Sequence, residues 1–180
     1  MKERKTMPFD KNFVPALRFA VMSDIHIDDE DCIEEQRFAK ALDDLKNLCS
    51  SDERYSGFDA LVIVGDFASR GSEIQMRKVK KILDAGLPAD VRLIMTMASH
   101  EYMTDGEENA LRRFDEIFGL TPDTHAVING FDFIAVTTTG GCHFDDKKRE
   151  FISAELEKAA ERDSKKPIFF FQHPHITDTV

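Results

Sequence analysis

Residues 60–71 of this 180-residue chain read ALVIVGDFASRG, a short apolar run that ends on a glycine and a carboxylate. The run is too short for a well-packed helix and is rich in β-branched residues, so it predicts a buried strand. Gly65 allows the backbone to turn tightly just before Asp66. In an open α/β sheet, ligands gather beyond the carboxyl ends of the strands, so Asp66 stands where a functional side chain is expected. Taken alone, Asp66 also fits an Asx turn or a helix cap.

The same arrangement recurs elsewhere in the chain. Each further apolar run predicts a buried strand and is followed at once by side chains that can bind a metal. These are Asp24 and His26 after residues 17–23, His100 and Glu101 after residues 91–99, and His173 and His175 after residues 167–172. Any one of them could be a loop hydrogen-bonding partner or a surface or core histidine. Together, carboxylates and imidazoles at one sheet edge predict a divalent-metal site, which is suited to phosphate-ester hydrolysis.

Helical patterns separate the predicted strands. Their apolar residues recur mostly at spacings of three and four, as in helices that turn one face to a core. The sets are Phe38, Leu42, Leu45 and Leu48; Ile74, Val79 and Leu83 after a Ser72 N-cap; Leu111, Phe114, Ile117 and Phe118; and Ile152, Leu156, Ala159 and Ala160. Asn129 and Gly130, between the segments 126–128 and 131–136, predict a β-hairpin. We therefore expect an α/β fold with a mixed sheet or two packed sheets.

The composition limits the class of protein. A hydrophobic content of 42% with 15 Phe residues indicates a packed domain, which we place at residues 17–180 after a polar lead-in at residues 1–16. The formal net charge is −10, from 24 Lys and Arg against 34 Asp and Glu, and no dense basic block occurs. This argues against a broad nucleic-acid-binding surface. It does not exclude a phosphate substrate, because bound metal ions reverse the local charge.

The sequence also predicts the cellular location of the protein. No apolar run approaches the roughly 20 residues of a membrane-spanning helix, so we expect no membrane partner. Cys32, Cys49 and Cys142 are widely spaced and form no C-x-x-C pair, which favours reduced thiols over a disulfide framework or a zinc ribbon. The basic start leads into no signal-like apolar stretch. These features predict a cytoplasmic protein.

Taken in order, D-x-H, G-D, x-H-E and a strand-borne histidine resemble the calcineurin-like metallophosphoesterase superfamily. Its pattern is D-x-H, G-D-x-x, G-N-H-[D/E], a strand-end His and a late G-H-x-H. The resemblance runs from Arg18 to about Thr179, and GDFASRG looks like the family's loop after its second strand. FISAELEKAAERDSKKPIFFFQH is similar to its helix-then-strand approach to the metal-binding His. The resemblance implies a metallophosphoesterase-like sandwich of mixed β-sheets flanked by helices.

The resemblance also implies an activity and a set of site residues. It implies hydrolysis of a phosphomonoester or phosphodiester by a hydroxide that two divalent metal ions (Mn, Fe or Zn) activate. His100 would be the catalytic proton donor near the leaving group. The implied metal ligands are Asp24 and His26 on one ion, Asp66 between the two ions, and His173 with Ser99 on the other.

The chain departs from the family pattern at two places. Ser99 replaces the Asn of G-N-H-[D/E], and its hydroxyl is a weaker ligand than an amide carbonyl. The chain ends at Val180 before a G-H-x-H, so we expect a domain that is incomplete at its C-terminus. His173–Pro174–His175 is an alternative match to that motif, with His175 as a further ligand, but the preceding helix and FFF run favour the earlier histidine. An incomplete sheet would leave an exposed edge, which favours self-association.

Three interpretations remain open at this point. The first is a metal-dependent hydrolase with a small phosphate ester as substrate. Met97 and Ser69 stand where protein Ser/Thr phosphatases have Arg and Asp, which disfavours that branch of the family. The alternative is a catalytically impaired binding or scaffold protein that keeps the fold, and Ser99 favours it. An unrelated α/β domain with coincidental polar residues at its strand ends is a third reading.

Overall fold

The structure is a computed structural model that describes residues 12–140 and 143–175. Strands and helices occur in the predicted order, while most of the predicted lead-in and Cys142 lie outside the described residues. The elements are β1 (Phe19–Met22), α1 (Ile33–Ser50), β2 (Ala60–Val64), α2 (Glu73–Gly86), β3 (Arg92–Thr96), the short 3-10 helix η1 (His100–Tyr102), α3 (Glu107–Phe118), β4 (Thr124–Ile128), β5 (Phe131–Ala135), α4 (Asp146–Asp163) and β6 (Ile168–Phe171).

The strands form two three-stranded sheets. The first has the order β1-β2-β3 and is parallel throughout, with Ala20 opposite Leu61 and Val62 opposite Ile94. The second has the order β4-β5-β6, with β4 antiparallel and β6 parallel to β5. Because the strands of the first sheet are parallel, their carboxyl ends and the loops that follow meet at one edge.

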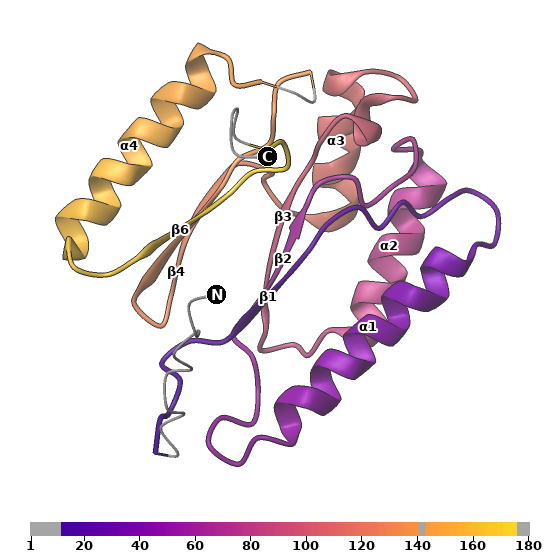
Figure 1. The fold of residues 1–180 in the computed structure, drawn as a ribbon. Helices are drawn as coiled ribbons and strands as arrows, with labels where there is room; N and C mark the ends of the chain where they lie inside the picture. The colour runs from indigo at the N-terminus through magenta and orange to yellow at the C-terminus, as the bar shows by residue number, and fades with distance from the viewer. Residues whose placement is uncertain (1–11, 141–142, 176–180) are drawn as a thin grey trace, which may run out of the picture.

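The two sheets pack face to face, and helices cover the outer faces. Figure 1 shows α1, α2 and α3 along one side of the molecule and α4 along the other, with the strands between them. Val62 and Ile94 of the first sheet belong to the same buried cluster as Phe133 of the second. The Phe19 ring meets the Phe133 ring edge-on at 5.0 Å and the Phe169 ring at 4.8 Å. The predicted sandwich of sheets flanked by helices is confirmed.

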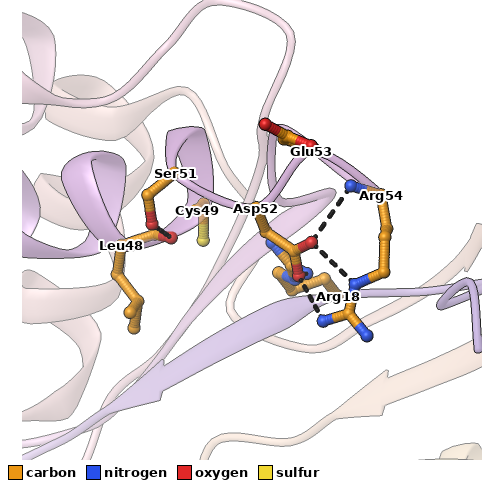
Figure 2. A pocket seen from close by; sticks show the side chains of 7 residues that line it. All are labelled: Arg18, Leu48, Cys49, Ser51, Asp52, Glu53 and Arg54. Carbon is orange, nitrogen blue, oxygen red and sulfur yellow. Dashed lines mark hydrogen bonds and ion pairs between the residues drawn. The ribbon is translucent and has the colours of Figure 1, made fainter. Parts of the chain in front are cut away.

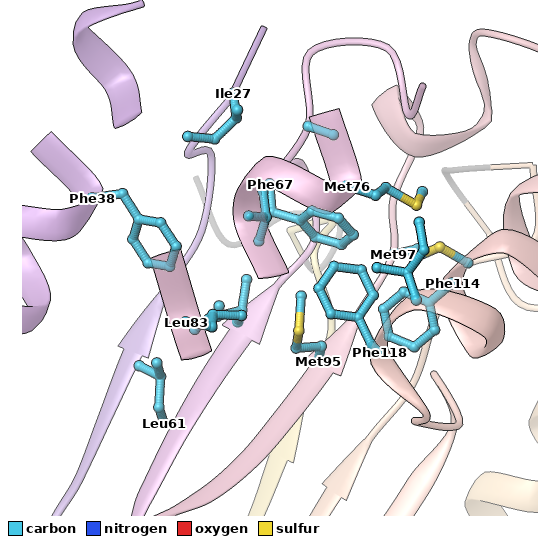
Figure 3. Packing of buried hydrophobic residues seen from close by; sticks show 14 of the residues in the cluster. Ile27, Phe38, Leu61, Phe67, Met76, Leu83, Met95, Met97, Phe114 and Phe118 are labelled. Carbon is cyan, nitrogen blue, oxygen red and sulfur yellow. The ribbon is translucent and has the colours of Figure 1, made fainter. Parts of the chain in front are cut away.

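A second apolar core lies between the first sheet and its helices. Figure 3 shows Phe67, Phe114 and Phe118 packed together in this core. The Phe67 ring lies 6.2 Å from that of Phe114 and 5.7 Å from that of Phe118. Phe67 directly follows Asp66 in the chain, so its burial fixes the loop that carries this carboxylate.

The predicted hairpin is confirmed between β4 and β5. Asn129 and Gly130 form its tip, with φ values of 50° and 78°. Two successive residues with positive φ match the strand twist as a type I′ turn, which Asn-Gly favours. This hairpin places β5 as the central strand of the second sheet.

The predicted apolar faces are right in part. Leu48 is 71% exposed and Cys49 is buried instead, because ten residues at 100° each put Leu48 about 80° away from Phe38. Ile74 is 57% exposed, because its five-residue distance from Val79 turns it to the opposite side of α2. In α4, Ala159 is buried, whereas Leu156 and Ala160 are exposed. No helix in the described parts of the chain is long and apolar enough to cross a membrane.

Candidate metal centre

The carboxyl ends of three strands deliver the predicted ligands to one place. Asp24, Asp66 and His173 each stand two residues beyond the end of their strand, in β1, β2 and β6 respectively. Backbone hydrogen bonds join the first two loops, from the Asp24 N–H to the Gly65 carbonyl at 3.4 Å and from the His26 N–H to the Asp66 carbonyl at 3.0 Å. Two sheets thus contribute to one site.

The backbone of this site is strained. Asp24, His26 and Asp66 have φ values of 55°, 53° and 51°, in the left-handed region that side-chain-bearing residues seldom adopt. Such a conformation costs about 1–3 kcal/mol per residue and persists only where the surrounding structure imposes it. Among the described non-glycine residues, Asn129 at the hairpin tip is the other case of positive φ. The strain is therefore concentrated on predicted metal ligands.

Gly65 allows the strand ends to approach this closely. Its φ is 68°, and a Cβ at this position would lie 2.6 Å from the Cβ of Ala98 and 3.1 Å from the Cβ and Cγ of His173. A larger residue would push apart the loops that follow β2, β3 and β6. The expectation of a tight backbone turn before Asp66 is confirmed by this geometry.

Two groups of side chains at the site can hold a cation. One consists of His26, Asp66 and His100, and the other of Asp24, Asp66 and His173; within each group the ligand atoms lie within 4.8 Å of one another. Asp66 belongs to both groups, and its two oxygens can serve two ions. Imidazole nitrogen mixed with carboxylate oxygen is a donor set that suits Mn, Fe or Zn. The side chains therefore fit a pair of divalent cations.

Backbone carbonyls orient two of the imidazole rings. The Nδ1–H of His173 donates to the Val64 carbonyl at 2.8 Å, which turns Nε2 towards Asp66 Oδ2 at 3.2 Å. The Nδ1–H of His100 donates to the Ser69 carbonyl at 2.7 Å, so its Nε2 is left for a ligand or a proton. Metal-binding histidines usually donate their second ring N–H in this way. The sequence carries no signal for these carbonyls, because every residue has one.

Asp66 and His173 form a charged pair in the absence of a cation. The hydrogen bond to Asp66 raises the pKa of His173 to about 9, although partial burial opposes this shift. Burial works against the charged form of Asp66, but hydrogen bonds from His173 and from the His100 N–H hold its pKa below the ordinary value. A cation that binds His173 must displace this proton, so binding couples to pH.

A buried carboxylate lies directly behind the site. Glu101 has no exposed surface and accepts hydrogen bonds from the backbone N–H groups of Asp66 at 2.9 Å, Ala68 at 3.0 Å and Ala98 at 2.8 Å. Burial raises the pKa of Glu101 to about 7, and the three N–H donors oppose this rise. The x-H-E pattern marked this residue, but the sequence assigned it no role.

The structure brings most of the predicted residues together. The His26 and His100 rings meet edge-on at 4.6 Å, and His26 Nε2 lies 3.8 Å from Asp24 Oδ1. Ser99 is exposed at the start of η1, and its side chain makes no capping hydrogen bond. His175 is exposed, and it belongs to neither of the two groups found among the described residues.

Two cavities differ in their relation to these residues. One of 810 Å³ borders Asp24, His26 and Ser69 and extends along α1. Another of 620 Å³, shown in Figure 2, lies beyond the amino end of β1, at Arg18 and Asp52. There the Arg18 Nη2–H donates to Asp52 Oδ2 at 2.7 Å, and Arg54 also binds this carboxylate. None of the predicted metal ligands lines this second cavity, so the first cavity is the one that belongs to the site.

The comparisons with known proteins give one family for this chain. A solved structure of a cold-active protein tyrosine phosphatase is similar to this chain, with 14% sequence identity and a TM-score of 0.34. The similarity covers 85% of this chain and 52% of that protein, so the chain spans about half its length. No curated protein sequence has a significant match. The family model of the calcineurin-like phosphoesterases matches residues 17–178, and the chain therefore belongs to that family.

Proposed function

We propose that this protein is a metal-dependent hydrolase of phosphate esters that works with two divalent cations. The observation that carries this proposal is the position of Asp66, whose carboxylate is common to both cation-binding groups at the strand ends. A shared carboxylate is expected where two metal ions act on one phosphate. Membership in the calcineurin-like phosphoesterase family supports the same reaction.

The side chains have distinct parts in this proposal. Asp24 and His26 would hold one cation, His173 with Ser99 would hold the other, and Asp66 would bind both. The bound cations supply Lewis acidity and lower the pKa of a water molecule from 15.7 to about 7. The division of ligands between the ions stays a prediction. In the structure Asp24 groups with His173 rather than with His26, and His100 groups with His26 and Asp66, whereas the proposal places His100 beside the ions as the acid.

His100 is the proposed proton donor. Its Nδ1–H is committed to the Ser69 carbonyl at 2.7 Å, which fixes the ring and its tautomer. A proton on Nε2 can then pass to the oxygen of the departing alcohol. General acids of this kind contribute most when the leaving group is poor, because such an alkoxide departs slowly without protonation.

The substrate is proposed to be a small phosphate ester. The 810 Å³ cavity beside Asp24 and His26 offers room for its organic part. Phosphomonoesters and phosphodiesters are both compatible with this site, as are Mn, Fe and Zn as the cations. The free thiols of Cys32 and Cys49 support a reducing, cytoplasmic location.

The test is the Asp66→Asn variant. Replacing the shared carboxylate with an amide should abolish Mn²⁺-dependent hydrolysis of an aryl phosphate, because the bridging charge is lost. Asp52→Asn is the control, since Asp52 binds Arg18 and Arg54 at the other end of β1 and should retain turnover. Unchanged turnover in Asp66→Asn would sink the proposal.

A scaffold or binding protein is the second candidate, and Ser99 is the observation that favours it. Its hydroxyl stands where the family has an amide carbonyl, so the second cation would bind weakly. If the protein has lost the chemistry in this way, Ser99→Asn should add a second metal ion to a parent that binds one. Equal metal stoichiometry in the two proteins counts against the scaffold function.

Self-association through open sheet edges is a further part of the proposal. Within residues 12–140 and 143–175, β1 and β6 are edge strands, and they lie on the same side of the sandwich because the Phe19 ring packs on Phe169 and Phe171. Val21 and Phe170 on these strands are exposed apolar residues. Charged residues on an edge strand oppose pairing, so Val21→Lys should convert a dimer into a monomer in light-scattering measurements. A parent protein that is itself monomeric contradicts this part.

A further inference from the structure

We propose that Glu101 is a positioning residue, whose buried carboxylate holds the loops after β2 and β3 in the arrangement that the two cations require. The inference rests on the proposed function, because it concerns the geometry of the same metal site. Glu101 does not reach the cations or the substrate in this proposal. It acts through the backbone of Asp66 and of the segment that leads to His100.

The contacts of Glu101 all go to site loops. Oε2 accepts the N–H groups of Asp66 at 2.9 Å and Ala98 at 2.8 Å, and Oε1 accepts that of Ala68 at 3.0 Å. Asp66 and Ala68 belong to the loop after β2, whereas Ala98 belongs to the loop after β3. One side chain thus ties two neighbouring loops together at the point where each of them carries a predicted site residue.

Three N–H donors require an acceptor with free lone pairs on both oxygens, which a carboxylate provides. No Lys or Arg in the described parts of the chain forms an ion pair with Glu101, which has no exposed surface. Backbone N–H groups therefore take the place of a counter-ion. Burying a carboxylate without an ion pair costs free energy. We infer that Glu101 serves to place the backbone to which it is hydrogen-bonded.

The contacts continue from Glu101 to the predicted ligands. Its hydrogen bond to the Asp66 N–H supports a residue whose φ of 51° is otherwise unfavourable. The Asp66 carboxylate then accepts the His100 N–H at 3.2 Å on Oδ1 and faces His173 Nε2 at 3.2 Å on Oδ2. A shift of the loop would move both oxygens of the bridging carboxylate relative to these histidines.

The backbone of Glu101 is confined as well. A Cβ on Gly71, which has a φ of 71°, would lie 1.9 Å from the Glu101 carbonyl oxygen. The loop after β2 therefore closes against the main chain of Glu101 as well as against its carboxylate. Both contacts hold the main chain of Glu101 in place. Loss of its carboxylate should therefore shift the Asp66 loop and not the backbone of residue 101.

The experiment compares two buried carboxylates. In Glu101→Gln, an amide nitrogen replaces one oxygen, so at least one backbone N–H loses its acceptor. The matched control is Asp132→Asn, which removes a buried carboxylate that binds His125 and Arg162 near the start of β6, away from the site. Each metal-stripped protein is titrated with Mn²⁺ calorimetrically, and its thermal midpoint is recorded.

We expect Glu101→Gln to bind Mn²⁺ about 10- to 100-fold more weakly, as is usual when a group that orients metal ligands is lost. Asp132→Asn should lower the thermal midpoint but leave the Mn²⁺ affinity within about twofold of the parent, because distant sites act independently. An unchanged affinity in a folded Glu101→Gln overturns the inference and leaves the proposed function standing. A parent that binds neither Mn²⁺ nor, in parallel titrations, Fe²⁺ or Zn²⁺ refutes the proposed function itself.

A measurement on the parent keeps the inference testable if Glu101→Gln does not fold. The amide hydrogens of Asp66, Ala68 and Ala98 should exchange slowly with solvent in the metal-free protein, although they lie in loops, because each donates to the buried carboxylate. Exchange at the rate of unprotected amides would overturn the inference without any variant.

Discussion

Replacing Gly65 with alanine should destabilise the protein and disturb the candidate metal site together. Gly65 has a φ of 68°, where an added Cβ costs about 1–2 kcal/mol. The new Cβ would also lie 2.6 Å from the Cβ of Ala98, whereas carbon atoms in contact prefer about 3.5–4.0 Å. Ala98 is fully buried, so the strain cannot be relieved towards solvent, and such overpacking costs about 1–3 kcal/mol more. The free energy of unfolding should therefore fall by about 2–5 kcal/mol.

Gly119→Ala separates the two contributions to this loss. Gly119 also has a positive φ, of 62°, but a Cβ there would meet nothing within 4 Å. Its replacement should therefore show the backbone cost alone, about 1–2 kcal/mol. The assay is urea unfolding of each metal-free variant, followed by circular dichroism and paired with a Mn²⁺ titration. Equal losses of stability in the two variants, or an unchanged Mn²⁺ affinity in Gly65→Ala, would refute the reasoning.

Three further outcomes follow from the same structure. His100→Ala should slow hydrolysis of esters with poor leaving groups far more than that of aryl phosphates, and a uniform loss of kcat across leaving groups would contradict the proton-donor role. In the metal-free protein, Asp66 raises the pKa of His173 from 6.5 to about 9. The ion pair therefore stabilises the folded protein fully below pH 6.5, and this stabilisation disappears as the pH rises through about 9. Thermal melts should show this loss, and Asp66→Asn should largely remove it; a parent whose stability is flat over that window would argue against the pair. Phe133→Ala should cost about 3–5 kcal/mol in urea unfolding, because Phe133 is fully buried between the sheets, whereas Phe170→Ala on the exposed edge should cost much less. Similar losses for the two would mean that the sheets do not pack as described.

Much of the architecture was predictable because it depends on local patterns. The apolar run before Asp66 and the Asn129–Gly130 turn each encode their element within a few residues, and the structure contains both. The buried faces of the helices were predicted less accurately, because Leu48 and Ile74 are exposed. A one- or two-residue error in the helical period turns a side chain out of the core, and an apolar residue by itself does not reveal its angle around the helix.

The candidate site divides in the same way between sequence and structure. The sequence was enough to predict which residues form the candidate site, because metal binding needs particular side chains at the ends of strands. These residues are Asp24, His26, Asp66, His100 and His173. The convergence of the β6 histidine with the ends of β1 and β2 follows from the packing of two separate sheets, which no local pattern specifies.

The sequence by itself therefore determined which side chains are available and which elements carry them. Only the tertiary structure decided that Glu101 lies behind Asp66, that the Ser69 carbonyl orients His100, and that Gly65 brings the loops into contact. The physical reason is that these are contacts between segments far apart in the chain. They are made largely through backbone N–H and carbonyl groups, which every residue has and which therefore leave no mark in the sequence.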